Sequence, residues 1–127
     1  MIKNIIIVAL GGAAGSVARC LVSKAVQGTL LSAFPLGTMA VNVAGCLLIG
    51  LAGGLASGPS PAVGQDMKLL LTTGFCGGFT TFSTFMNEAF TLGHGGNPAL
   101  AALYVGASIA AGLLAVPAGC WLARALQ

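Results

Sequence analysis

The chain has 127 residues, of which 57% are hydrophobic and only 6% are charged. Because soluble domains carry about 25% charged residues, this composition excludes an ordinary globular protein and predicts an integral membrane protein. A net charge of +3, dispersed along the chain, excludes a nucleic-acid partner. At about 20 residues per span, the length predicts one all-α membrane domain, residues 1–127, with four spans at 5–27, 36–56, 67–92 and 98–124.

In the first predicted span, small residues lead to a charge. Gly11 and Gly15 form a GxxxG pair, which allows a second helix to approach closely. Arg19 follows four residues later on the same face. An arginine inside a span is costly and by default marks an ion pathway. Near the end of a span it is also able to extend its guanidinium to the lipid headgroups, so both interpretations stay open.

The second predicted span begins after Pro35 and holds a carboxamide, Asn42, well inside the membrane. Thr38, Asn42 and Gly45 fall on one helical face. A buried asparagine must be hydrogen-bonded, so bonding between helices is one interpretation. Its NH₂ group carries two donors, which is also what a dehydrated small anion requires.

Residues 74–85 interrupt the third predicted span. They begin with three glycines within five residues, at positions 74, 77 and 78. Each glycine costs a helix about 1 kcal/mol relative to alanine, so we expect the helix to break at these glycines. Irregular backbone at membrane depth must be buried or line a cavity, which makes this break a candidate functional site.

Three phenylalanines follow at helical spacing. Phe79, Phe82 and Phe85 recur at every third position, which places their rings along one face of a resumed helix. Packing against a neighbouring helix is the alternative to a functional role for these rings. The hydroxyls between them, including Ser83 and Thr84, are equally able to bond back to the preceding turn.

The two acidic residues lie near the two ends of the third predicted span. Asp66 is expected to cap its start, and Glu88 lies near its end, where a carboxylate is usually solvated or bonded to neighbouring backbone. We assign Glu88 no role. The fourth predicted span begins with Asn97 as N-cap and Pro98 as first helical residue, and Pro117 is expected to kink it.

Four cysteines lie in apolar segments, each more than twenty residues from the next, at positions 20, 46, 76 and 120. This spacing matches no metal-binding or redox motif, so we expect small, buried, inert thiols.

Positive charge specifies the orientation in the membrane only weakly, with a bias of three to one or three to two. With four spans, Lys3, Lys68 and Arg124 lie on one side and Lys24 on the other, while Arg19 is ambiguous. So small a bias permits both orientations in the membrane. The chain also looks too small to enclose an ion path alone, so we expect a homodimer with two-fold symmetry.

Four segments together resemble the Fluc (CrcB) family of microbial fluoride channels. They are residues 11–19, residues 35–45, the run GFCGGFTTFSTF at 74–85 with Glu88, and Tyr104 with Ser108. The resemblance covers nearly the whole chain in order and spacing, and the glycine- and phenylalanine-rich run is its most specific part.

The resemblance implies an antiparallel, dual-topology homodimer in the inner (plasma) membrane that exports fluoride passively through two pores. It also implies a structural Na⁺ at the dyad, bound by backbone carbonyls of Gly77 and Thr80 from both subunits. Arg19 would concentrate anions in an aqueous vestibule. The residues implied along the fluoride pore are Asn42 as donor, Phe82 and Phe85 through their ring edges, and a hydroxyl track of Ser83, Thr84, Tyr104 and Ser108. Met86 and Gly112 stand where the family commonly carries hydroxyls, so the track departs from the family pattern there.

Two other classes of protein compete with a channel. A proton-coupled transporter of the small multidrug-resistance type is also a small dual-topology dimer, but it needs a membrane-embedded carboxylate. The first, second and fourth predicted spans contain no Asp or Glu. A purely structural subunit would explain the glycines but not Arg19 or Asn42. The sequence shows no phosphate-binding loop or catalytic triad, so we expect no enzyme activity.

Overall fold

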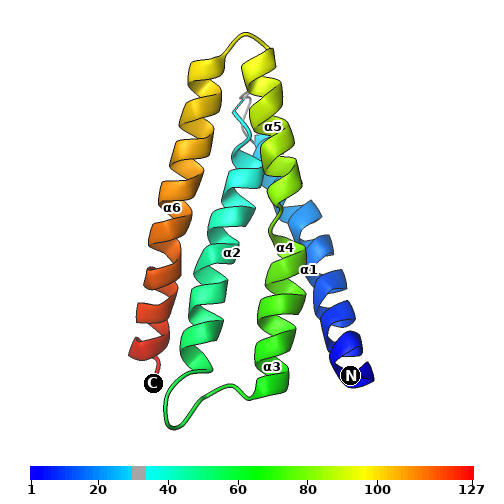
Figure 1. Ribbon diagram of the computed structural model, residues 1–127, viewed down its shortest axis with the longest axis vertical. Helices are drawn as coiled ribbons and strands as arrows, with labels where there is room; N and C mark the ends of the chain where they lie inside the picture. Colours follow the sequence, from blue (N-terminus) through cyan, green and yellow to red (C-terminus); the bar gives the residue numbers. More distant parts are fainter. Residues whose placement is uncertain (30–33) are drawn as a thin grey trace.

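The computed structural model describes residues 1–29 and 34–127, and within them every regular element is a helix, as the composition predicted (Figure 1). Three helices are long and apolar enough to cross a membrane: α1 (Ile2–Thr29), α2 (Leu36–Leu55) and α6 (Pro98–Ala125). Between α2 and α6 the chain forms a limb of shorter pieces, which we call the broken limb. It consists of α3 (Gln65–Leu69), the π-helix η1 (Leu70–Cys76), α4 (Gly77–Phe79) and α5 (Phe82–His94).

The broken limb is interrupted two residues beyond the last glycine, not at the glycines themselves. Gly77 and Gly78 remain helical, whereas Thr80 (φ −86°, ψ 160°) and Thr81 (φ −150°, ψ 115°) are extended. The predicted position of the break was therefore wrong. Packing explains the difference, because a Cβ atom on Gly78 would collide with the carbonyl oxygen of Gly12 in α1. The glycines thus allow α4 to pack closely against α1, and this packing offsets their low helix propensity.

The three phenylalanines do not share one helical face, because the break separates the first from the others. Phe79 ends α4 and stacks on Phe75, with ring centroids 5.5 Å apart. Phe82 and Phe85 lie on α5 with centroids 6.2 Å apart and an interplanar angle of 69°. The prediction that Phe79, Phe82 and Phe85 share one helical face was therefore wrong.

The close approach predicted for Gly11 and Gly15 is confirmed. A Cβ atom on Gly11 would lie 2.6 Å from the carbonyl oxygen of Leu70, and one on Gly15 would collide with the carbonyl oxygen of Phe75. These glycines bring α1 against η1, backbone to backbone. Without a hydrophobic driving force inside the membrane, such close van der Waals contact is what holds helices together.

Helices α2 and α6 also pack through small residues. A Cβ atom on Gly119 of α6 would lie 2.7 Å from the amide nitrogen of Leu51, and one on Gly50 would collide with the carbonyl oxygen of Val116. The predicted start of α6 is confirmed, since the Asn97 side chain accepts a 3.3 Å hydrogen bond from the Leu100 amide. The helix continues through Pro117 to Ala125 without a break.

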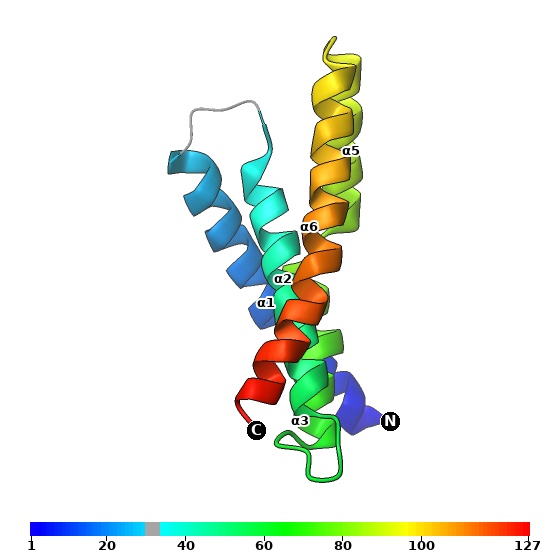
Figure 2. The same ribbon diagram turned by 90° about the vertical axis from the view of Figure 1, so that its left-hand side faces the viewer.

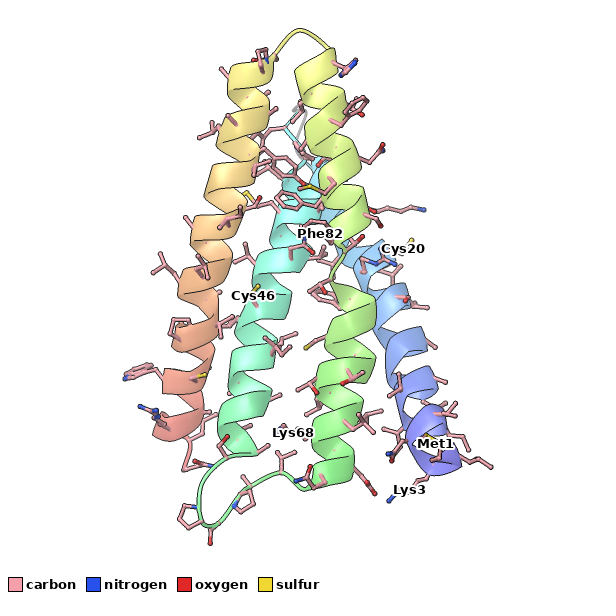
Figure 3. The ribbon with its side chains drawn as sticks, viewed as in Figure 1. Met1, Lys3, Cys20, Cys46, Lys68 and Phe82 are labelled. Atoms are coloured by element: carbon pink, nitrogen blue, oxygen red, sulfur yellow. The ribbon has the colours of Figure 1, made fainter. Side chains whose placement is uncertain are left out.

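Both chain termini and the start of the broken limb lie at one end of the molecule (Figures 1 and 2). Asp66 was expected to cap this limb, but the cap position is Gly64 and has no side-chain hydrogen bond. Asp66 instead forms an exposed ion pair with Lys3 of α1, with 3.1 Å between Nζ and the carboxylate oxygen. Lys3 and Lys68 both lie at this end in Figure 3. Two elements far apart in sequence are therefore also joined at the surface.

Candidate functional site

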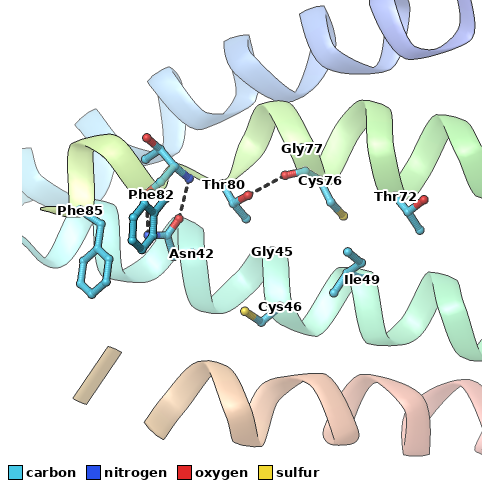
Figure 4. Close-up of a pocket in the computed structure, with 11 residues that line it drawn as sticks. Asn42, Gly45, Cys46, Ile49, Thr72, Cys76, Gly77, Thr80, Phe82 and Phe85 are labelled. Carbon is cyan, nitrogen blue, oxygen red and sulfur yellow. Dashed lines mark hydrogen bonds between the residues drawn. The ribbon is translucent and has the colours of Figure 1, made fainter. Parts of the chain in front are cut away.

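A cavity of about 330 Å³, called here the break cavity, lies beside the interruption, between α2 and the broken limb (Figure 4). It brings together five residues that the sequence or the resemblance had singled out: Asn42, Gly77, Thr80, Phe82 and Phe85. The other residues that line it are Gly45, Cys46, Ile49, Thr72, Cys76 and Thr81. Its lining combines the Asn42 carboxamide with the aromatic rings of Phe82 and Phe85.

Asn42 of α2 closes the gap in the backbone of the broken limb. Its Nδ2 donates to the carbonyl oxygen of Thr81 at 3.1 Å, and its Oδ1 accepts from the amide of Thr81 at 2.8 Å. The carboxamide thereby satisfies both backbone groups of an extended residue, as irregular backbone in a membrane requires. Bonding between helices, one of the two interpretations of Asn42, is confirmed. A carboxamide has two N–H donors, so one remains for the cavity.

The same pairing frees a carbonyl oxygen at Gly77. In an unbroken α-helix the Thr81 amide would donate to Gly77, four residues earlier, but here it donates to Asn42. The Thr80 hydroxyl donates to the carbonyl oxygen of Cys76 at 2.9 Å, so it is bound within the limb. Gly77 and Thr80 both line the break cavity. Backbone carbonyl oxygens that a break of this kind frees are ligands that suit a hard cation.

Phe82 and Phe85 differ sharply in exposure within the single chain. Phe82 is 73% exposed, whereas Phe85 is 7% exposed. Phe85 is held edge-on against Tyr104 of α6, with ring centroids 5.1 Å apart and an interplanar angle of 75°. One ring of the pair is therefore fixed in the protein core, and the other lies at the open side of the cavity.

A second cavity, of about 280 Å³, contains Arg19 and is called here the Arg19 cavity. Its other lining residues are Ser16, Cys20, Ser23, Thr38, Val41, Thr81 and Thr84. In the described part of the chain no carboxylate lies within 4 Å of the Arg19 guanidinium. Of the two interpretations of Arg19, this position favours a polar vestibule with uncompensated positive charge. Thr81 borders both cavities, so the extended backbone separates them.

The four hydroxyls of the implied track do not line one surface. Thr84 lies in the Arg19 cavity, with its Oγ1 3.1 Å from that of Thr81, whereas Ser83 is exposed and borders neither cavity described above. Tyr104 is fully buried and its hydroxyl is already hydrogen-bonded. The Ser108 hydroxyl is buried, and among the described residues it has no hydrogen-bond partner.

Sequence reasoning missed the position of Glu88. Its carboxylate accepts hydrogen bonds from the Thr38 hydroxyl of α2 at 2.7 Å and from the Tyr104 hydroxyl of α6 at 3.0 Å. Its partners are buried side chains, not solvent or backbone. Glu88 therefore ties α5 to two other helices. The shared face of Thr38 and Asn42 was a partial signal, but the direction in which α5 resumes after the break decides where Glu88 points.

Comparison with known proteins identifies relatives along the full chain. A family model described as CrcB-like protein, Camphor Resistance (CrcB) matches residues 6–120. The chain is 47% identical to a fluoride-specific ion channel FluC of Chlorobaculum tepidum, across 100% of this chain and 99% of that protein. Proteins with the same name from Rhizobium johnstonii (45% identity; 95% of this chain, 96% of theirs) and Phocaeicola vulgatus (40%; 96% and 99%) are similar over comparable lengths. Both cavities lie within the matched residues.

Proposed function

This chain belongs to the CrcB family, whose similar members are named as fluoride-specific ion channels, and we propose that it conducts fluoride passively out of the cell. It is a channel protein and not an enzyme. Fluoride enters cells as the neutral acid HF, which dissociates in the more alkaline cytoplasm. The anion then leaves through the channel in the plasma membrane, driven by the membrane potential.

The break cavity is the observation that carries this proposal. The remaining N–H of Asn42 supplies a hydrogen-bond donor, and the edges of Phe82 and Phe85 carry the positive part of the ring quadrupole. These groups replace part of the hydration shell of a small anion without a full charge that would trap it. A chloride ion is larger and more weakly hydrated, so it gains less from a narrow, donor-rich site.

The Arg19 cavity supports an accessory role in supplying anions. A positive charge at the end of a low-dielectric cavity raises the local anion concentration, and it does so more strongly at low ionic strength. Thr84 and Thr81 continue the polar lining from this cavity to the break. The hydroxyl track of Ser83, Thr84, Tyr104 and Ser108 is discontinuous within one chain, and we propose that a second copy completes it.

Exposed residues beside the break in the single chain support assembly with a second copy. Gly77 and Phe82 are exposed, although they flank the interrupted backbone at Thr80 and Thr81 and line the proposed pore. Because irregular backbone is not tolerated against lipid, we propose a homodimer that covers the break cavity. The near balance of Lys and Arg at the two ends supports antiparallel, dual-topology assembly.

In the proposed dimer, the backbone carbonyl oxygens at the break would act as ligands for a cation. One chain offers the backbone oxygens of Gly77 and Thr80, and a symmetric pair offers them twice, which suits a Na⁺ ion at the dimer axis. If such an ion is structural, protein purified in N-methylglucamine salts without Na⁺ is expected to lose fluoride flux and to regain it on Na⁺ addition. Full flux without any Na⁺, with residual Na⁺ checked by atomic absorption, would rule out this role.

Flux from liposomes tests the channel itself. Purified protein is expected to release fluoride when a K⁺ ionophore relieves the charge imbalance, with no proton gradient, and to retain chloride. Phe82→Ile is expected to abolish or sharply reduce this flux, whereas the dimer still assembles. Equal chloride release would contradict a fluoride-selective channel, and a requirement for a proton gradient would favour the coupled transporter.

A further inference from the structure

Polar side chains occupy successive turns where α2 and α6 pack together. The two helices lie side by side and run in the same direction (Figure 1). Thr38 of α2 and Tyr104 of α6 stand at one level, because both donate hydrogen bonds to the Glu88 carboxylate. Four residues further along each helix are Asn42 and Ser108. Since residues four apart share a helical face, these two residues stand at the next level.

Cys46 and Gly112 form the third level of this series. A Cβ atom on Gly112 would lie 3.2 Å from the Sγ atom of Cys46, so the thiol fills the space that the glycine leaves. Cys46 was expected to be buried and inert, but it is only partly buried and also borders the break cavity (Figure 4). It therefore contacts α6 and the cavity at the same time. We call the three levels the polar row, which consists of Thr38, Asn42 and Cys46 of α2 with Tyr104, Ser108 and Gly112 of α6.

The Ser108 hydroxyl, at the middle level, is buried without a protein partner. Ser108 is 8% exposed, and among the described residues none forms a hydrogen bond with its Oγ atom. A buried hydroxyl without a partner is costly, which points to a ligand between the helices at this level. A thiol one turn further along is less costly to bury alone, because cysteine behaves as a small apolar residue with a weak S–H donor.

We propose that the Cys46 thiol takes part in anion coordination, as the step of the polar row that follows Ser108, an inference that rests on the proposed function. Gly112 supplies no side chain at this level, and its missing Cβ makes room for the thiol. The S–H donates a hydrogen bond to an anion at the edge of the break cavity and keeps its proton. Because a thiol is a weaker donor than the Asn42 amide, it holds the anion less tightly and favours its onward movement.

Moving the donor from α2 to α6 tests this role. Cys46→Ala is expected to reduce fluoride release from liposomes about fivefold, as the loss of one hydrogen bond predicts. Cys46→Ala/Gly112→Ser supplies a hydroxyl from the opposite helix and is expected to restore release. Cys46→Ala/Gly112→Ala fills the same space with a methyl group and no donor, so it is the matched control and should stay impaired. Size-exclusion chromatography checks that all three variants assemble like the parent.

The two double variants separate coordination from packing. Rescue by both would assign Cys46 to packing alone and overturn the proposal. Undiminished release by Cys46→Ala would also overturn it, as would failure of the serine variant to restore release while it assembles normally.

Infrared spectroscopy tests the contact without reference to transport, because the frequency of the S–H stretch reports hydrogen bonding of the thiol. Replacing gluconate with a high concentration of fluoride around the reconstituted parent is expected to shift one S–H band to lower frequency. The shift is expected to be absent from Cys46→Ala. No shift in the parent, or the same shift in Cys46→Ala, would contradict the proposal. If the parent shows the shift but releases no fluoride, the channel proposal fails and the thiol contact stands.

Discussion

At the level of single residues, Asn42 links the stability of the break to its chemistry. Its oxygen and one N–H bind both backbone groups of Thr81, at 2.8 and 3.1 Å. The residue that holds the interrupted backbone in place therefore also offers an amide donor at the cavity. Loss of this side chain affects folding and conduction together, and the two effects must be measured separately.

Asn42→Ala is expected to reduce fluoride flux by about tenfold or more, since a hydrogen bond to a charged group contributes about 1.5–3 kcal/mol. It also removes two bonds to Thr81, which is expected to lower the free energy of unfolding by about 2 kcal/mol. Flux from liposomes and unfolding in detergent measure the two effects. Asn87→Ala, at an exposed asparagine of α5, is the matched control and should change neither. Wild-type flux in Asn42→Ala would show that the pore lies elsewhere.

Glu88 is the second residue whose removal leaves buried hydrogen-bond donors without an acceptor. Glu88→Ala leaves the hydroxyls of Thr38 and Tyr104, which are 4% and 0% exposed, without their acceptor. We expect a loss of about 3 kcal/mol in the free energy of unfolding, because each buried unsatisfied group costs about 1–3 kcal/mol. Glu88→Gln keeps one acceptor oxygen and is expected to lose about 1 kcal/mol. Equal stability of Glu88→Ala and the parent would show that these bonds are not formed in the membrane.

At the level of elements, the broken limb shows what local sequence is able to predict. An interruption somewhere within residues 74–85 follows from glycine-rich sequence in an apolar span, and that much was predicted. Its displacement to Thr80 and Thr81 depends on α1, because Gly78 is held helical against Gly12. Asn42 and Arg19 were identifiable from their type alone, as polar groups in apolar spans. The partners of Glu88 and the contact between Cys46 and Gly112 depend on how helices pack, which the sequence pattern does not encode.

The contact between α1 and η1 makes a direct prediction for helix packing. Gly15→Leu places a side chain where the Phe75 carbonyl oxygen lies, so the two helices must separate. Overpacking of this kind costs about 1–3 kcal/mol or more, and we expect aggregated protein without flux. Ala14→Leu, one residue earlier on an exposed position, is the matched control and should purify and conduct normally. Size-exclusion chromatography and liposome flux distinguish the two. Normal behaviour of Gly15→Leu would contradict the backbone-to-backbone contact.

At the level of the whole molecule, the single chain is incomplete as a membrane protein. The interrupted backbone at Thr80 and Thr81 borders a cavity whose mouth carries the exposed Phe82 and Gly77. The only charged pair found in the described residues, Lys3 with Asp66, lies at the surface and does nothing to cover this region. A second copy of the same chain in the opposite orientation would cover this region. Such pairing requires only that the difference in positive charge between the two ends is small enough for both orientations to insert.

Dual topology therefore predicts complementation between variants of opposite charge bias. Lys24→Gln removes the positive charge from one end, and Lys3→Gln/Lys68→Gln/Arg124→Gln removes all three from the other. Loss of the exposed ion pair between Lys3 and Asp66 is expected to cost little stability. Because positive charge favours the cytoplasmic side, each variant is expected to insert mainly in one orientation.

Either charge variant expressed alone should give few antiparallel pairs and reduced fluoride release, and coexpression of the two should restore release. Labelling of the termini from each side of the membrane reports orientation, and fluoride release from liposomes of the purified proteins reports function. Gln65→Lys/Lys68→Gln moves a charge within one end and is the matched control, because the bias between ends is unchanged. If each biased variant conducts like the parent while all its termini lie on one side, pairing in opposite orientations is not required for conduction.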